Sequence, residues 1–195
     1  NDDILTTGFP GSDHPTWGNF VSIRTYDESV AGTPQDGYVD ATNVTDPLTP
    51  GTGFMVYMPV GAATIDYPNY TINSGDYDLP VTYTDNGTGR GWNMVGNPYP
   101  ATISWSSGAW VKDHINNEVY VWNPNSQQYE SYTEAMGAGT LLIAPGQSFF
   151  VRANAASPVL TVREGCKTKG HGTFRSMETS NEYLTIRVQK DELQD

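Results

Sequence analysis

The sequence predicts an all-β fold, an antiparallel β-sandwich of the jelly-roll-like kind built from two related units. Three observations support this. Gly and Pro account for 20 and 13 of the 195 residues, so the chain is interrupted too often for long helices. Short segments rich in Val, Ile, Thr and Tyr alternate polar with apolar residues, as half-buried strands do. Two stretches of the chain also carry the same motifs in the same order.

The strands are expected to be short and separated by turns rich in Gly, Pro, Asn and Asp. Such spacing is typical of sandwiches. Residues 106–116 are the only segment that we expect to form a short helix. The segments predicted as strands are residues 21–26, 53–58, 63–72, 79–83, 91–95, 118–122, 140–143, 148–152, 159–163 and 183–188.

The internal repeat joins residues 23–57 to residues 119–152. Each copy has a strand that ends in an aromatic residue followed by Asp or Asn, then a return strand with a Tyr, then a Pro-Gly turn into an apolar strand. The Pro follows the aromatic residue by 24 positions in the first copy and by 23 in the second. The Asp or Asn supports a turn through its side chain, and Pro-Gly suits a type II turn. We expect the two units to pack face to face.

The repeat suggests a division of the chain. Residues 1–90 form a first unit that is incomplete at its N-terminus, and residues 91–176 form a second unit packed on the first. Residues 177–195 are interpreted as a linker and the first strand of a following domain. If residues 183–188 form a lone strand, that strand could complete a neighbouring subunit and build a filament by strand exchange.

Charge and composition exclude several classes of partner. The net charge is −12, and residues 1–151 contain only Arg24, Arg90 and Lys112 against 16 acidic residues. Nucleic acid is not an expected partner, because phosphate contacts need Lys and Arg. Membrane insertion is not expected either, since no apolar run approaches about 18 residues. The single cysteine, Cys166, leaves no intrachain disulfide.

Several of these motifs together resemble a known family of regions. Residues 91–100 (GWNMVGNPYP), 103–105, 119–123, 144–151 (APGQSFFV) and 172–175 occur in an order similar to that of a β-rich region in large secreted Bacteroidota proteins. There the region lies upstream of a C-terminal sorting domain read by the type IX secretion system. The resemblance spans about residues 21–188. It implies an extracellular or cell-surface location and no particular activity.

Catalytic chemistry finds little support in the residues. Glu118, Glu130 and Glu134 are placed on ordinary turn and strand surface, not as a carboxylate pair across a cleft. Cys166 and His171 lie in a Gly- and Lys-rich stretch that looks like a hairpin loop, and a structural cysteine is the better interpretation. We therefore expect no enzyme activity.

Calcium is the one cofactor that the sequence suggests. Asp27, Asp36 and Asp40 fall in or beside one long loop. Carboxylate oxygens in flexible loops are the ligands that Ca²⁺ prefers. No contiguous EF-hand pattern accompanies them, so the prediction rests on this grouping alone.

The five tryptophans suggest carbohydrate binding, because exposed flat rings can stack on sugar faces. Trp105 and Trp110 flank a Ser-Ser-Gly sequence and are the candidate exposed rings. Trp92 and Trp122 lie on strands inside the repeated motifs, so we expect both in the core.

The sequence thus favours a non-catalytic structural or adhesive module of a secreted, cell-surface multidomain protein. Its expected partners are neighbouring domains of the same parent chain or like subunits. The alternative is a carbohydrate-binding accessory module of an extracellular hydrolase, with polysaccharide as partner. Exposed, coplanar Trp rings would favour the alternative, and strand exchange between chains would favour the structural role.

Overall fold

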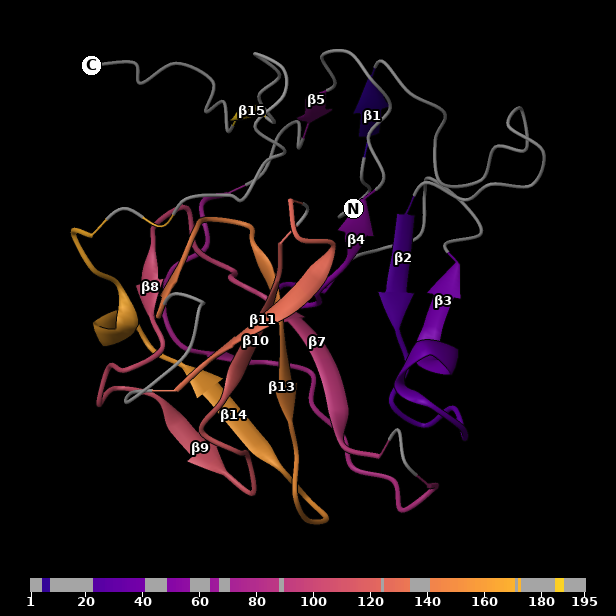
Figure 1. Ribbon diagram of the computed structural model, residues 1–195. Coiled ribbons are helices and arrows are strands. Elements are labelled where there is room, and N and C mark those ends of the chain that lie inside the picture. Colours follow the sequence, from indigo (N-terminus) through magenta and orange to yellow (C-terminus); the bar gives the residue numbers. More distant parts are fainter. Residues whose placement is uncertain are drawn as a thin grey trace, which may run out of the picture.

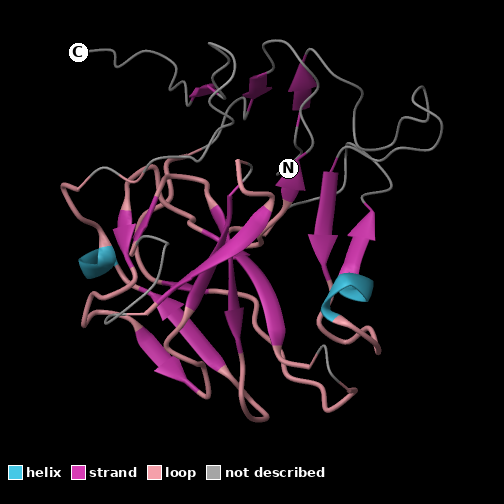
Figure 2. Cartoon of the chain, in the orientation of Figure 1, coloured by secondary structure: helices cyan, strands magenta, loops and turns pink. Residues whose placement is uncertain are grey.

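A computed structural model describes residues 5–7, 23–40, 49–56, 64–66, 71–87, 90–123, 125–133, 141–170, 172 and 185–187. For residues 5–7, 64–66 and 185–187 it describes the backbone alone. The fold class is confirmed: the described chain is all-β, with antiparallel sheets consistent with a β-sandwich (Figure 2). Its helical elements are the 3₁₀ turns η1 (Pro34–Gly37) and η2 (Glu164–Cys166). No helix in the described part has the length and apolar character to cross a membrane.

The strands form a central sheet and several smaller ones (Figure 1). The central sheet has the order β11 (Gln128–Tyr132), β10 (Val119–Asn123), β13 (Ser148–Arg152), β7 (Trp92–Gly96). Two smaller sheets have the orders β6 (Tyr77–Asp78), β14 (Val159–Val162), β9 (Val111–Asp113) and β12 (Leu142–Ile143), β8 (Ile103–Ser104). The other two have the orders β3 (Tyr38–Asp40), β2 (Ile23–Tyr26), β4 (Met55–Val56) and β1 (Leu5–Thr7), β5 (Thr64–Asp66), β15 (Thr185–Arg187).

One apolar core joins the central sheet to the two small sheets β6-β14-β9 and β12-β8. Strand residues alternate between faces, so every second side chain of β10 and β13 points into it. The fully or nearly fully buried members are Leu79, Val95, Tyr99, Ile103, Trp105, Trp110, Val119, Val121, Ile143, Phe149, Val151, Leu160, Val162 and Cys166. The opposite face of the central sheet, which we call its outer face, carries the alternate residues.

Two sequence predictions fail locally. The expected helix at residues 106–116 is wrong, because Val111–Asp113 instead pairs with β14 as strand β9. Residues 79–83 are not a strand in the structure. Leu79 still donates its amide to the Leu160 carbonyl (2.8 Å), but Pro80 has no amide to give. The amide of Thr82 then bonds the side chain of Asn93 at 2.8 Å, not a neighbouring strand.

The repeat predicted from the sequence appears as repeated strand pairing. In the first copy β2 lies between β3 and β4, and in the second β10 lies between β11 and β13. Tyr26 faces Tyr38 across the first hairpin, and Trp122 faces Tyr129 across the second. The register to the third strand also agrees, with Arg24 opposite Met55 and Tyr120 opposite Phe150.

The turns of the two copies match as well. The Asp or Asn that ends the first strand accepts the amide two residues on, Ser29 to Asp27 at 2.8 Å and Asn125 to Asn123 at 2.9 Å. The Pro-Gly turns each close with one backbone hydrogen bond, Thr52 to Thr49 at 2.9 Å and Gln147 to Ala144 at 3.1 Å. Gly51 and Gly146 have φ of 88° and 67°, which suits the third position of a type II turn.

The two copies meet at β7. One edge of β7 pairs with β13, and its other edge meets the chain that leaves the first Pro-Gly turn. There Thr52 bridges Val95, and the Gly96 amide donates to the Gly51 carbonyl at 2.8 Å. Strand β6, inside the first predicted unit, also pairs with β14 of the second. Sheet pairing therefore crosses the predicted boundary at residue 90.

The C-terminal strand is paired within its own chain. Thr185–Arg187 runs parallel to β5 at one side of the sheet β1-β5-β15. The condition attached to strand exchange, a lone strand at residues 183–188, is therefore not met at residues 185–187. Strand exchange itself stays a prediction.

Candidate functional site

The three aspartates predicted to bind calcium are each engaged locally. Asp27 accepts the amide and hydroxyl of Ser29, Asp36 accepts the amide and hydroxyl of Thr33, and Asp40 pairs with Arg24 at 2.6 Å. The hydrogen bonds from Thr33 lower the pKa of Asp36. In the described ranges, no group of three or more His, Cys, Asp or Glu residues is placed to hold a metal ion. The structure therefore does not bring these three carboxylates together as one group; each stabilises its own turn or strand pair, and calcium binding at them stays a prediction.

Trp105 and Trp110 are core residues, not exposed rings. Their exposed fractions are 0% and 8%. The rings pack edge to face with centroids 5.0 Å apart, and the Lys112 ammonium lies 3.6 Å from the Trp105 ring centroid. The two indole N–H groups donate to backbone carbonyls, Trp105 to Asn117 and Trp110 to Ser104, both at 2.8 Å. The prediction that they bind carbohydrate is wrong, because no ring face is open to a ligand.

The residues considered for catalysis are dispersed. Cys166 is fully buried, and burial raises the pKa of its thiol, which disfavours the nucleophilic thiolate. Glu118 and Glu130 are half-buried, and Glu130 accepts a hydrogen bond from the side chain of Asn123. Glu134 and His171 lie outside the described residues.

Two buried side-chain amides, those of Asn97 and Gln147, hold loops of the described chain in place. The buried Asn97 side chain donates to the backbone carbonyls of Ala101 (2.8 Å), Ala144 (3.0 Å) and Ile143 (3.2 Å), and it accepts the Tyr99 amide at 3.0 Å. The buried Gln147 side chain accepts the Ala144 amide at 2.9 Å. Buried amides bonded in this way fix the shape of the loops that they connect.

Glu28 is a buried carboxylate that was not among the residues predicted from the sequence. Only 4% exposed, it accepts the amides of Gly91 (2.7 Å) and Thr84 (2.8 Å) and the hydroxyl of Thr82 (3.1 Å). It therefore holds the turn after β2 against the segment that leads into β7. A lone Glu in a polar turn carries no pattern by which its burial could be predicted.

The outer face of the central sheet carries a continuous aromatic surface. We call it the aromatic face, and it consists of Trp92, Tyr120, Trp122, Tyr129 and Phe150. Neighbouring rings meet edge to face, with centroid separations of 4.8 Å for Trp92 and Tyr120, 5.2 Å for Tyr129 and Phe150, and 5.1 Å for Trp122 and Tyr129. Cross-strand pairs of this kind stabilise a sheet.

The expectation that Trp122 is a core residue is wrong. Trp122 is 36% exposed and its partner Tyr129 is 37% exposed. Trp92, also expected in the core, is half-buried on the same outer face. Alternation along β10 could have revealed this, because Val119 and Val121 point inward and the residues between and after them must point outward.

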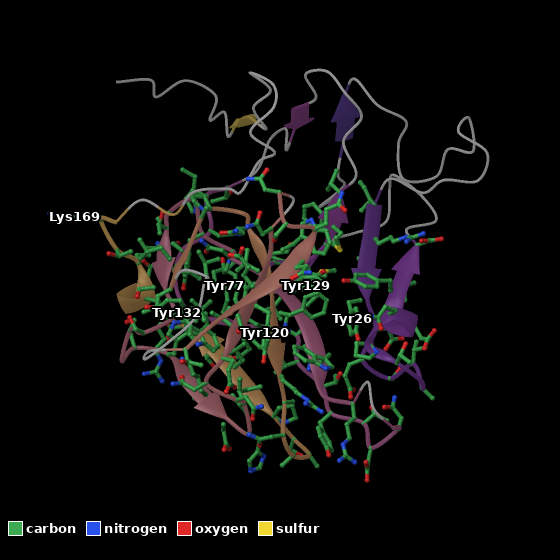
Figure 3. The ribbon with its side chains drawn as sticks, in the orientation of Figure 1. Tyr26, Tyr77, Tyr120, Tyr129, Tyr132 and Lys169 are labelled. Atoms are coloured by element: carbon green, nitrogen blue, oxygen red, sulfur yellow. The ribbon has the colours of Figure 1, made fainter. Side chains whose placement is uncertain are left out.

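The β2–β3 hairpin covers part of the aromatic face. Tyr26 packs on Phe150 at 4.9 Å, between this hairpin and the central sheet (Figure 3). Tyr38 packs on Tyr26 at 5.3 Å, and its hydroxyl bonds the hydroxyl of Tyr129. Burial raises the pKa of Tyr26 to about 12 and also raises the pKa of Tyr129. These hydroxyls therefore stay protonated at neutral pH.

Fold and site together define an all-β scaffold whose buried polar groups hold its loops and whose exposed feature is an aromatic face. No protein-family model, curated protein or solved structure matches this chain.

Proposed function

We propose that this chain is a non-catalytic structural or adhesive module of a secreted, cell-surface multidomain protein. One observation carries the proposal: the buried side-chain amides of Asn97 and Gln147, in segments 91–100 and 144–151, are bonded to the backbone of the loops that these segments form. Motifs of this kind specify a rigid scaffold. Neighbouring domains of the parent chain or like subunits are its proposed partners.

The proposed location is extracellular or on the cell surface. It rests on the resemblance of residues 91–100 and 144–151 to β-rich regions of secreted Bacteroidota proteins that use type IX secretion. The single cysteine and the acidic composition are compatible with this location, since such a scaffold relies on packing rather than disulfides.

The adhesive role is tested with beads to which the chain is attached through one of its termini. Retention of the beads on immobilised polysaccharide or on bacterial surfaces, or reversible self-association in light scattering, is the expected result. A panel of glycoside and ester substrates is incubated with the same preparation and should show no turnover. Turnover, or beads that neither associate with each other nor adhere to any surface, would contradict the proposal.

A carbohydrate-binding accessory module of an extracellular hydrolase is the second candidate. Exposure of Trp122 and Tyr129 on one face favours it, although the planes of the two rings meet at 65° and do not form a flat platform. The polysaccharide would then contact the outer face of the central sheet, not Trp105 and Trp110.

A further inference from the structure

We propose that Trp122 and Tyr129, at the end of the β10–β11 hairpin, form a subsite for a neutral glycan chain. The proposal rests on the adhesive role above and gives that role a ligand class. The two residues face each other across the hairpin, and both are exposed by more than a third. We call this pair the aromatic step.

The shape of the aromatic step suits a sugar ring. The two ring planes are inclined at 65° with centroids 5.1 Å apart. A sugar ring could therefore stack on the face of one aromatic ring and contact the other ring at its side. A pyranose presents C–H groups on one face and hydroxyls at its edge. The apolar face of such a sugar removes aromatic surface from water, while its hydroxyls remain hydrated.

The step is held in place before any ligand arrives. The Tyr129 hydroxyl contacts the hydroxyl of Tyr38 and donates to the Met55 sulfur at 3.4 Å. The Tyr129 ring also packs on the buried Phe150. Anchoring the hydroxyl end leaves the exposed ring face in one orientation. A ligand that binds it therefore loses little free energy in ordering the site.

The charges around the step favour a neutral ligand over an anionic one. Two of the three basic residues of the first 151 lie elsewhere, Arg90 with Asp85 and Lys112 over the Trp105 ring. The third, Arg24, lies opposite Met55, and its charge is paired with Asp40 at 2.6 Å. Arg152 shares the outer face but lies over Trp92, 5.5 Å from its ring centroid. A uronate or sulfated glycan would therefore meet a strongly acidic protein in which these described cations already have partners.

The surroundings of the step favour a sugar over a protein partner. The adjoining turn offers the exposed polar side chains of Ser126 and Gln127, and Ser131 on β11 shares the outer face. A stable protein interface buries roughly 800 Å² per partner around an apolar centre. Two exposed rings bordered by hydroxyl and amide groups match one or two sugar residues better.

The test is affinity electrophoresis of the full chain through gels that contain a single polysaccharide. The neutral probes are hydroxyethylcellulose, laminarin and galactomannan, and the anionic probes are alginate and polygalacturonate. We expect retardation by at least one neutral probe and by neither anionic probe. Trp122→Ala should weaken the affinity at least tenfold, and Tyr129→Phe, which keeps the ring but loses its hydroxyl anchor, should weaken it less than Trp122→Ala does.

A matched control is Val159→Ala, which removes another exposed apolar side chain from β14 and should leave retardation unchanged. Thermal melting of each variant shows that it is folded. Retardation by no neutral probe, or equal retardation of Trp122→Ala and the unmodified chain, would overturn the proposed subsite. The proposed subsite would also be overturned if no glycan retards the chain and the chain instead self-associates in a way that Trp122→Ala abolishes. Beads that adhere to surfaces regardless of Trp122 would refute the subsite and leave the adhesive role standing.

Discussion

The four tryptophans that the structure describes occupy different environments, and the neighbouring backbone decides the environment of each. Trp105 follows β8 into a turn closed by the Ser107 amide on the Ser104 carbonyl at 3.2 Å, and this turn directs the ring inward. Trp122 stands at an outward position of a regular strand. A tryptophan beside small polar residues is therefore no guide to exposure, whereas its position in a strand's alternation is.

This contrast predicts different stability losses at the two positions. Trp105→Ala should lower the free energy of unfolding by about 3–5 kcal/mol, because a fully buried ring leaves a cavity. Trp122→Ala should lower it by less than about 1 kcal/mol, since its ring is partly in water already. Guanidinium chloride denaturation measures both. Similar losses at the two sites would show that the aromatic face contributes to stability as strongly as the core.

The buried carboxylate of Glu28 leads to a second prediction at this scale. Glu28→Ala leaves the amides of Gly91 and Thr84 without their acceptor, at roughly 1–3 kcal/mol for each buried group. Glu28→Gln keeps an oxygen in the same place and should lose less than half as much. Urea denaturation at neutral pH distinguishes them. An equal loss in both variants would indicate that the negative charge, not the acceptor geometry, matters.

Among the elements, those that obey a simple local pattern were predictable from sequence. Ser148–Arg152 has a continuous apolar centre and follows a Pro-Gly turn, and the structure reproduces the predicted bounds of that strand. Strands β6 and β8, each two residues long, have no such pattern. They exist because partners distant in sequence, β14 and β12, bring main-chain groups to them.

The candidate site was less predictable than the fold for the same reason. The repeat located Trp122 and Tyr129 on paired strands, but nothing local showed which sheet face would be open. That depends on where the β2–β3 hairpin packs, and Tyr26 of the hairpin packs on Phe150, more than 100 residues away in sequence. Within the hairpin, Gly37 leaves room for the Tyr26 ring, since a Cβ at position 37 would lie 2.5 Å from that ring.

The packing of this hairpin predicts sensitivity to alkaline pH. The pKa of Tyr26 rises from 10.0 to about 12 on folding, chiefly through burial. The stability that this shift contributes is complete below about pH 10 and is lost as pH rises from about 10 to about 12. We expect the melting temperature to fall over this window, and to fall less in Tyr26→Phe.

Tyr99 provides the comparison, because burial also raises its pKa to about 12 while it lies in the core, not under the hairpin. Tyr99→Phe should reduce the alkaline loss too, and the double variant should reduce it most. Phenolate absorbance and the melting temperature are measured for each variant from neutral to alkaline pH. A melting temperature that falls equally in all variants over this window would contradict the assignment.

For the whole molecule, the repeat suggests two units while the packing joins them. Asp27 and Asn123, and the two Pro-Gly turns, show that the copies share one local design. Yet Leu79, from the first predicted unit, lies 3% exposed in the core of the second. Gly51 of the first turn also approaches it, since a Cβ there would lie 2.5 Å from the Leu79 side chain. The motif is therefore present twice in this chain, while residues of both predicted units contribute to one core.

A truncation series tests this shared core. Residues 91–176 alone lack β6 and Leu79, so β14 loses one of its two partner strands and the ring of Tyr99 loses Tyr77, 5.8 Å away. We expect this fragment to melt without a cooperative transition, because a gap opens in the core. Residues 71–176 restore these elements while still omitting the β2–β3 hairpin, and should melt cooperatively at a lower temperature than the full chain. Circular dichroism melting compares the three. Cooperative melting of residues 91–176 at the temperature of residues 71–176 would instead make residue 90 a true domain boundary, with β6 dispensable to the sandwich.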